Sequence, residues 1–266
     1  MFRGRAIASG RDRPATAPSV LSPTEPSHDR DAGLPAGIAP VSAPPVARTD
    51  DLRISAVRPL VVPALLQERV AMRDDALALV GRTRAAIADI LHGRVDRLLV
   101  VVGPCSIHDH EQALEYGARL KAVADELGDE LLLVMRAYFE KPRTTVGWKG
   151  FINDPHLDGT FAINEGLERA RRLLVALAAM GLPTGTEFLD LLSPQYICDL
   201  VSWGAIGART TESQSHRQLA SGLSCPVGFK NGTDGSVKVA ADAILAARAP
   251  HAFMGITKLG LSLIHI

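Results

Sequence analysis

Short apolar runs alternate with amphipathic segments along most of the chain, and this alternation constrains the fold more than any other feature. The runs at 98–102 (LLVVV) and 131–135 (LLLVM) contain no polar residue. A strand that is apolar on both faces is typical of a parallel sheet covered by helices, so we expect both runs to be buried strands. The same reasoning predicts further short strands at 184–189, 205–209, 226–230 and 252–257.

The segments between these runs have the three- or four-residue apolar spacing or the end signals of helices. Helices are expected at 74–91, 110–127, 163–181, 193–203, 212–222 and 234–249. Strands that are each followed by a helix indicate either a (β/α)₈ barrel or a doubly wound sheet. No G-x-G-x-x-G follows the first strand, which disfavours a dinucleotide-binding sheet. We predict an α/β fold, an incomplete (β/α)₈ TIM-type barrel with about six of its eight βα units and an N-terminal extension.

Changes in composition divide the chain into four parts. Residues 1–49 are rich in Pro, Ala and Ser without an apolar period, and we expect them to be disordered. Residues 50–97 are expected to form an extended arm (through LVVPALL) and a helix, and residues 98–260 the partial barrel. Residues 261–266 (LSLIHI) are a short terminal segment that we do not assign to the barrel.

The charge balance excludes some classes of partner. The chain of 266 residues has 29 Lys and Arg against 29 Asp and Glu, so no global field attracts nucleic acid or an anionic membrane. No apolar run reaches the roughly 18 residues that a membrane span needs. Three cysteines do not make a disulfide framework, and a reducing cytoplasm is the expected location.

Cationic residues gather at the predicted carboxyl ends of the strands, where parallel α/β folds bind ligands. Such a set of cations on one rim predicts a ligand with several negative charges. The alternative is that each cation pairs with a local acid such as Glu140, Glu187 or Glu212. Lys230 lies within an apolar run, where an unpaired ammonium would be costly and a bound anion would satisfy it. The five cations are Arg136, Lys141, Arg143, Arg209 and Lys230.

Cys105 directly follows the first strand and its Gly-Pro turn. A thiolate there could hold a metal ion, but a lone cysteine without a C-x-x-C partner is more typical of a small buried apolar residue. The spacing by itself favours the buried residue.

Several long motifs closely resemble the class I 3-deoxy-D-arabino-heptulosonate 7-phosphate (DAHP) synthases. The resemblance covers about Asp50 to Gly260 and implies a metal-dependent condensation of phosphoenolpyruvate with erythrose 4-phosphate that releases phosphate. This reaction is the first step of the shikimate route to the aromatic amino acids. The motifs are LLVVVGPCSIHD, VMRAYFEKPRTTVGWKGFINDPHLDGTF, GTEFLDLLSPQY, SWGAIGARTTESQSHRQLASGLSCPVGFKNGTDG and FMGITK.

The resemblance also implies roles for individual residues. Lys141 and Arg136 are implied as catalytic, and Cys105 as one ligand of a divalent manganese, iron, cobalt or zinc ion, in place of the buried apolar role. Phosphoenolpyruvate is expected to bind Arg136, Arg209 and Lys230 beside Glu187, and the sugar phosphate to bind Lys141, Arg143 and Thr144.

Feedback inhibition by an aromatic amino acid is a further implication, with Phe, Tyr and Trp left as alternatives. For Pro194, a first-turn position after a Ser193 N-cap is a sufficient simpler explanation. The extended arm implies a homo-oligomer. The residues that match the effector site are Asp50, Asp51, Pro194, Gln195, Leu223, Ser224 and Phe253.

The sequence departs from the family pattern after Gly260. The family continues with another phosphate-binding Arg and two βα units that bring a His, a Glu and an Asp to the metal, whereas LSLIHI does not match. We therefore expect a truncated chain that is inactive or insoluble as it stands. A non-catalytic effector-binding remnant is one alternative. An octulosonate-phosphate synthase is another, disfavoured by KPRTTVGWKG.

Overall fold

The computed structural model describes residues 49–260 and 262–265, so the predicted disorder of residues 1–49 falls almost wholly outside the described residues. The chain divides into two compact units, Met1–Ser55 and Ala56–Ile266. In the first unit a turn brings the Ile54 amide within 3.2 Å of the Asp51 carbonyl oxygen, and Asp51 has φ 54°. All helices and strands of the described residues belong to the second unit.

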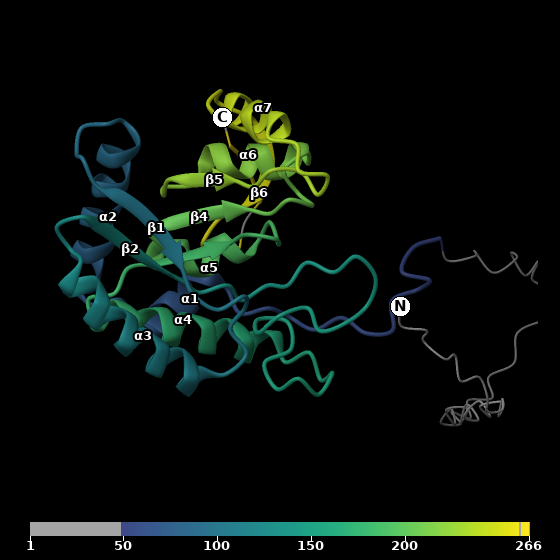
Figure 1. The fold of residues 1–266 in the computed structure, drawn as a ribbon. Coiled ribbons are helices and arrows are strands. Elements are labelled where there is room, and N and C mark those ends of the chain that lie inside the picture. The colour runs from purple at the N-terminus through teal and green to yellow at the C-terminus, as the bar shows by residue number, and fades with distance from the viewer. Residues whose placement is uncertain (1–48, 261, 266) are drawn as a thin grey trace, which may run out of the picture. The chain divides into compact units, whose positions relative to one another are not determined.

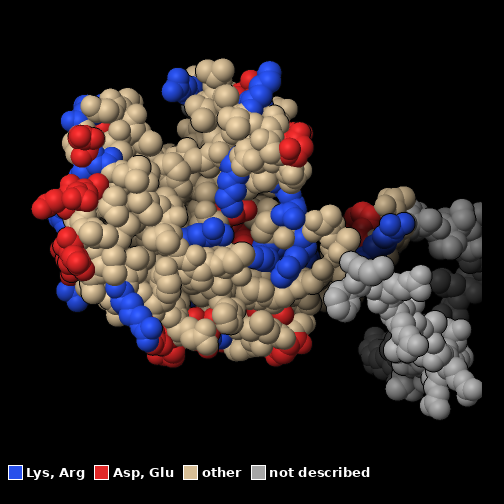
Figure 2. Space-filling model, viewed as in Figure 1, with Lys and Arg blue, Asp and Glu red and all other residues tan. Residues whose placement is uncertain are grey.

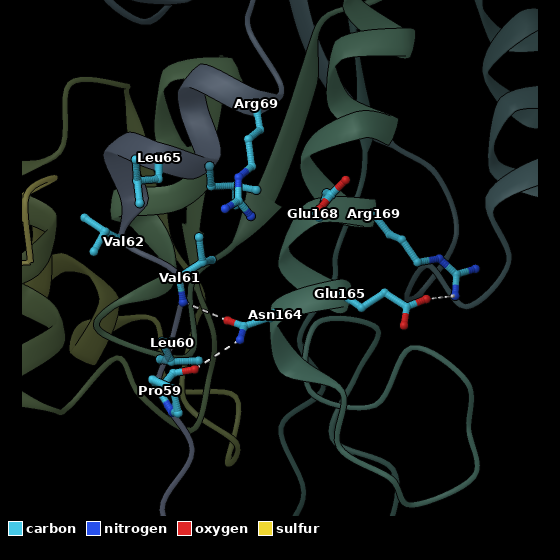
Figure 3. A pocket seen from close by; sticks show the side chains of 11 residues that line it. Pro59, Leu60, Val61, Val62, Leu65, Arg69, Asn164, Glu165, Glu168 and Arg169 are labelled. Carbon is cyan, nitrogen blue, oxygen red and sulfur yellow. Dashed lines mark hydrogen bonds and ion pairs between the residues drawn. The ribbon is translucent and has the colours of Figure 1, made fainter.

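The second unit begins with an extended segment that leads into helix α1 (Pro63–Arg69). The prediction of an extended arm was wrong from Pro63 onward, because Pro at the first position is pre-set for a helix. The oxygen and the nitrogen of the Asn164 side chain each form a hydrogen bond with the backbone of the arm. Its Oδ1 accepts from the Val61 amide at 2.8 Å, and its Nδ2 donates to the Pro59 carbonyl at 3.1 Å, beside a cavity of about 710 Å³ (Figure 3).

Five strands form one parallel sheet in chain order, β1-β2-β3-β4-β5 (Figure 1). This order confirms the α/β class and the parallel sheet, with five βα units among the described residues. β1 and β2 pair along their whole apolar runs, with Leu98 opposite Leu131. The strands are β1 (Leu98–Val102), β2 (Leu131–Arg136), β3 (Thr184–Glu187), β4 (Trp203–Ile206) and β5 (Val227–Phe229).

Helices cover the sheet, as their apolar spacing predicts. In Figure 1, α3 and α4 run beside the β1–β3 end of the sheet, and α6 and α7 lie beside β4 and β5. Asp109 caps α3 by accepting from the Gln112 amide at 2.8 Å. None of the described helices is long and apolar enough to cross a membrane. Their bounds are α2 (Asp74–Leu91), α3 (His110–Glu126), α4 (Ile163–Ala179), α5 (Ser193–Ile197), α6 (Gln214–Gly222) and α7 (Lys238–Ala247).

The sixth predicted strand does not join the parallel sheet. β6 (Phe253–Ile256) pairs antiparallel with β7 (Ser262–His265) in a separate two-stranded sheet. Gly260, with φ 77°, lies in the turn between them, where positive φ favours glycine. An apolar run reads alike in a parallel strand and in a hairpin, so the sequence pattern could not separate the two.

Two further predictions were wrong in detail. β1 was expected to be buried, but Leu98 is 63% exposed and Val102 37% exposed, because β1 is an edge strand that pairs with β2 alone. The helix expected at 193–203 ends at Ile197 and is followed by a 3₁₀ turn, Cys198–Leu200. Trp203 is instead the first residue of β4, in register with Gly185.

Candidate functional site

The carboxyl ends of β1 and β2 are brought together by a close backbone contact at Gly103. A Cβ on Gly103 would lie 2.8 Å from the Arg136 carbonyl oxygen, so only glycine lets the two segments approach this closely. The next turn carries Cys105, whose carbonyl accepts a hydrogen bond from Arg136 Nη2 at 3.2 Å. The sheet geometry therefore places two residues that are 31 positions apart side by side, as the strand-end prediction required.

Lys141 joins the same group. Its Nζ donates to the sulfur of the exposed Cys105 at 2.6 Å. This hydrogen bond is the main cause that lowers the pKa of the Cys105 thiol below its usual value. Burial opposes it as the second-largest cause, and the charges of Lys141, Arg136 and Lys230 add to the lowering. The thiol is thus prepared to ionise beside a cation.

Tyr138 holds two cations over one aromatic ring. Arg136 Cζ lies 4.2 Å from the ring centre and Lys230 Nζ lies 5.1 Å from it. Burial raises the pKa of Tyr138 to about 12, so the phenol stays neutral at physiological pH. Sequence reasoning missed Tyr138, although its position two residues after Arg136 in the strand-end segment was a usable signal.

Lys230 is paired with an acid, as the simpler alternative for these cations proposed. Its Nζ lies 2.6 Å from Oε2 of Glu187, a side chain that is only 5% exposed. Lys230 therefore has an acidic partner within the chain, and its part in binding phosphoenolpyruvate stays a prediction. Glu187 thus lies beside one of the cations, and a Cβ at Gly207 would approach its Oε1 to 2.2 Å.

The other predicted cations do not all reach this group. Arg143 Nε donates to the Trp148 carbonyl at 2.8 Å within its own loop, and Thr144 is exposed. Arg209 is exposed in the turn after β4, and no hydrogen bond or ion pair joins its side chain to another described residue. Figure 2 shows several Lys and Arg side chains near the middle of the viewed face, with a small acidic patch between them. The cluster that the contacts define consists of Cys105, Arg136, Tyr138, Lys141, Glu187 and Lys230.

The cluster does not by itself fit a metal centre. Across the part of the chain that is described, no three His, Cys, Asp or Glu side chains are placed to hold a metal ion. Cys105 is a single thiol whose hydrogen-bonded neighbour is an ammonium group. A catalytic metal takes several protein ligands, so we assign no chemical step here to a metal.

Five of the seven predicted effector residues line two neighbouring cavities of the second unit. Pro194 and Ser224 line a cavity of about 260 Å³, and Phe253 lines one of about 480 Å³. Gln195 and Leu223 line both. Asp50 and Asp51 belong to the first unit, and their part in an effector site stays a prediction.

Cys105 is expected to be the thiol that reacts first with an alkylating reagent. The thiolate is the nucleophile, and Cys105 alone combines an exposed sulfur with an adjacent ammonium, whereas Cys198 is half-buried and Cys225 buried. We expect iodoacetamide at neutral pH to label Cys105 several times faster than the other two, as site-resolved mass spectrometry would measure. Labelling of Cys225 at an equal rate would contradict the geometry described here.

The fold and the cluster define an α/β protein with a cationic site at the carboxyl ends of a parallel sheet. The sequence profile described as the DAHP synthetase I family matches residues 69–266. Since this range is most of the chain, the protein belongs to the DAHP synthetase I family.

Named relatives agree with this membership. The chain is 61% identical over 217 residues to "Phospho-2-dehydro-3-deoxyheptonate aldolase, Phe-sensitive" of Escherichia coli K12, which covers 82% of this chain and 62% of the relative. It is 59% identical over 216 residues to the tyrosine-inhibited enzyme of the same name from Candida albicans, covering 81% and 58%. A solved structure of the enzyme from Francisella tularensis superposes with TM-score 0.78 at 52% identity, covering 79% of this chain and 62% of that one. The chain thus spans about three fifths of the length of these relatives.

Proposed function

We propose that this chain carries the phosphoenolpyruvate-binding part of a DAHP synthase. The observation that carries the proposal is the contact of Arg136 and Lys230 with one Tyr138 ring, beside Lys141 and Cys105. Glu187 neutralises Lys230, which leaves Arg136 and Lys141 as cations without an acidic partner among the described residues. The buried Nε of Arg136 also has no hydrogen-bond partner in the described part of the chain. These groups are available to a phosphate or a carboxylate.

The proposed reaction joins phosphoenolpyruvate and erythrose 4-phosphate. The enol carbon attacks the aldehyde, water adds at the neighbouring carbon, and phosphate leaves. Arg136, Lys230 and Arg209 would hold the phosphate and carboxylate of phosphoenolpyruvate beside Glu187. Fixed positive charges both orient this reactant and stabilise the departing phosphate.

Lys141 is proposed to bind both reactants, because it contacts the cluster and also lines a cavity formed by its own loop. It contacts Cys105 on one side, and on the other it lines a cavity of about 330 Å³ together with Arg143 and Lys149. The sugar phosphate would bind there, with Thr144 nearby in the same loop. Metal dependence, with Cys105 as one ligand, is proposed on the family resemblance alone.

Regulation and assembly are proposed on separate observations. The cavities lined by Gln195 and Leu223 would take an aromatic amino acid, since one relative is named Phe-sensitive and another tyrosine-inhibited. Their identities of 61% and 59% are too close to choose between these effectors. The exposed apolar residues Val57 and Leu60 of the arm favour a homo-oligomer, and the expected location is the cytoplasm.

Phosphate release measured with phosphoenolpyruvate and each of two sugar phosphates tests the proposal. We expect release with erythrose 4-phosphate and not with arabinose 5-phosphate, the reactant of the octulosonate branch. Saturable binding of phosphoenolpyruvate in calorimetry would accompany it. Binding without release would favour a non-catalytic effector-binding protein, and the absence of both binding and release would refute the proposed site.

A further inference from the structure

Glu140 is a buried carboxylate that lies outside the cluster of Cys105, Arg136, Tyr138, Lys141, Glu187 and Lys230. It lies in the segment that follows β2, is 5% exposed, and accepts three hydrogen bonds from a segment about fifty residues away in sequence. Oε2 accepts from the Leu189 amide at 3.2 Å and from Ser193 Oγ at 3.0 Å, and Oε1 accepts from the Asp190 amide at 3.0 Å. The N-cap role expected for Ser193 was wrong, because Ser193 is the first residue of α5. Its hydroxyl donates to Glu140 and does not cap the helix.

The backbone of Glu140 closes the loop that carries Lys141. Glu140 forms an antiparallel bridge with Gly150, and the Lys141 amide donates to the Lys149 carbonyl at 2.9 Å. A Cβ on Gly150 would lie 2.2 Å from the Phe139 carbonyl oxygen, so this crossing requires glycine. Residues 143–147 beyond the crossing are all exposed. The base of the loop is thus the part that fixes where the Lys141 side chain begins.

Burial of an ionisable group at this place carries a cost that an apolar side chain would avoid. Desolvation is the main cause that raises the pKa of Glu140 to about 7, with the nearby Asp190 adding to the rise and the donors from Leu189 and Ser193 opposing it. The amides of Leu189 and Asp190 and the Ser193 hydroxyl need an acceptor. A carboxyl group can accept hydrogen bonds both when it is ionised and when it is protonated. When Glu140 is protonated, it can donate to Ser193 Oγ, whose hydrogen then turns to the Asp190 carbonyl at 3.3 Å.

We propose that Glu140 is a positioning residue for Lys141, in that its carboxyl group fixes the base of the 141–149 loop to segment 189–193 and so holds the Lys141 ammonium against Cys105. The geometric part of this inference concerns only groups within the chain. Its kinetic consequence rests on the proposed function.

The contact between Lys141 and Cys105 gives a readout that needs no substrate. Lys141→Ala removes the ammonium that lies 2.6 Å from the Cys105 sulfur and sets the full effect, which we expect to be an alkylation of Cys105 several times slower than in the wild type. The rate is measured on the purified 266-residue chain at one neutral pH.

The test compares Glu140→Gln with Ser193→Ala and with Glu111→Gln, an exposed carboxylate on α3 as control. In Glu140→Gln the amide nitrogen cannot accept the hydrogen bonds that reach one carboxylate oxygen, so we expect at least half of the Lys141→Ala effect on a logarithmic scale. Ser193→Ala removes one donor of three and should give a smaller change in the same direction. The control should leave the alkylation rate unchanged.

A merely structural role would give another pattern. If Glu140→Gln and Ser193→Ala lower the thermal midpoint while Cys105 is alkylated at the wild-type rate, the proposal is overturned. Should Glu140→Gln fail to fold, Ser193→Ala decides alone. In an active preparation we also expect a higher KM for erythrose 4-phosphate with little change for phosphoenolpyruvate. Slower alkylation in a chain without turnover would retain the positioning role and reject the proposed function.

Discussion

Replacing Lys141 with alanine is expected to lower turnover of phosphoenolpyruvate with erythrose 4-phosphate by about a hundredfold or more. Removing one fixed group that stabilises charge in a transition state commonly costs this much. Lys141 is the cation that contacts Cys105 and also lines the neighbouring cavity, so it has access to both proposed reactants. Arg136→Ala should have an effect of similar size, because Arg136 shares the Tyr138 ring with Lys230.

The measurement is the rate of phosphate release at saturating concentrations of both reactants. Lys238→Ala is a matched control, since this lysine is 83% exposed on α7 and Asp242 is its only ion-pair partner among the described residues. Its rate should equal that of the wild type. Near-normal turnover of Lys141→Ala would refute the role of Lys141. For a chain that binds without turnover, the affinity for erythrose 4-phosphate is the quantity to compare.

Arg171→Ala is expected to lower the free energy of unfolding by about 3–5 kcal/mol, because it leaves a partly buried acid without its partner. Arg171 lies on α4 with its side chain 1% exposed. Its two terminal nitrogens lie 2.7 and 2.8 Å from the carboxylate oxygens of Asp199. It also donates to the carbonyl oxygens of Val70 and Tyr196 at 2.8 and 3.0 Å. One guanidinium therefore joins α4 to the end of α1, to α5 and to the 3₁₀ turn.

The adjacent residue is the control for Arg171. Arg172 forms a surface ion pair with Glu168 one turn earlier, and its side chain is 56% exposed. Arg172→Ala should change the free energy of unfolding by less than about 0.5 kcal/mol. Urea-induced unfolding of the three proteins gives both values. An Arg171→Ala protein within about 1 kcal/mol of the wild type would contradict the buried network.

Local sequence signals predicted most of the fold correctly. The helix expected at 74–91 has those bounds in the structure, and the runs at 98–102 and 131–135 form neighbouring parallel strands. These elements follow from apolar spacing, turn residues and helix ends, which act over a few residues. The same signals could not place β6, because pairing partners lie outside the window that the spacing describes.

The residues of the site, like the strands, were predicted only in part from the sequence. The sequence identified Arg136, Lys141 and Cys105 as strand-end residues, and the parallel sheet brings them together. It did not predict the roles of Tyr138, Glu140 or Arg171, whose functions depend on side chains that lie far along the chain.

The sequence by itself therefore determined the class of fold, the positions of the strands of the parallel sheet along the chain and the residue types at their carboxyl ends. Only the tertiary structure decided which polar and charged side chains pair with one another. Lys230 is paired with Glu187 across 43 positions, and Glu140 accepts from Leu189 across 49. The physical reason is that secondary structure depends on neighbouring residues, whereas a hydrogen bond between distant side chains exists only once strand register and loop closure have set both groups within about 3 Å.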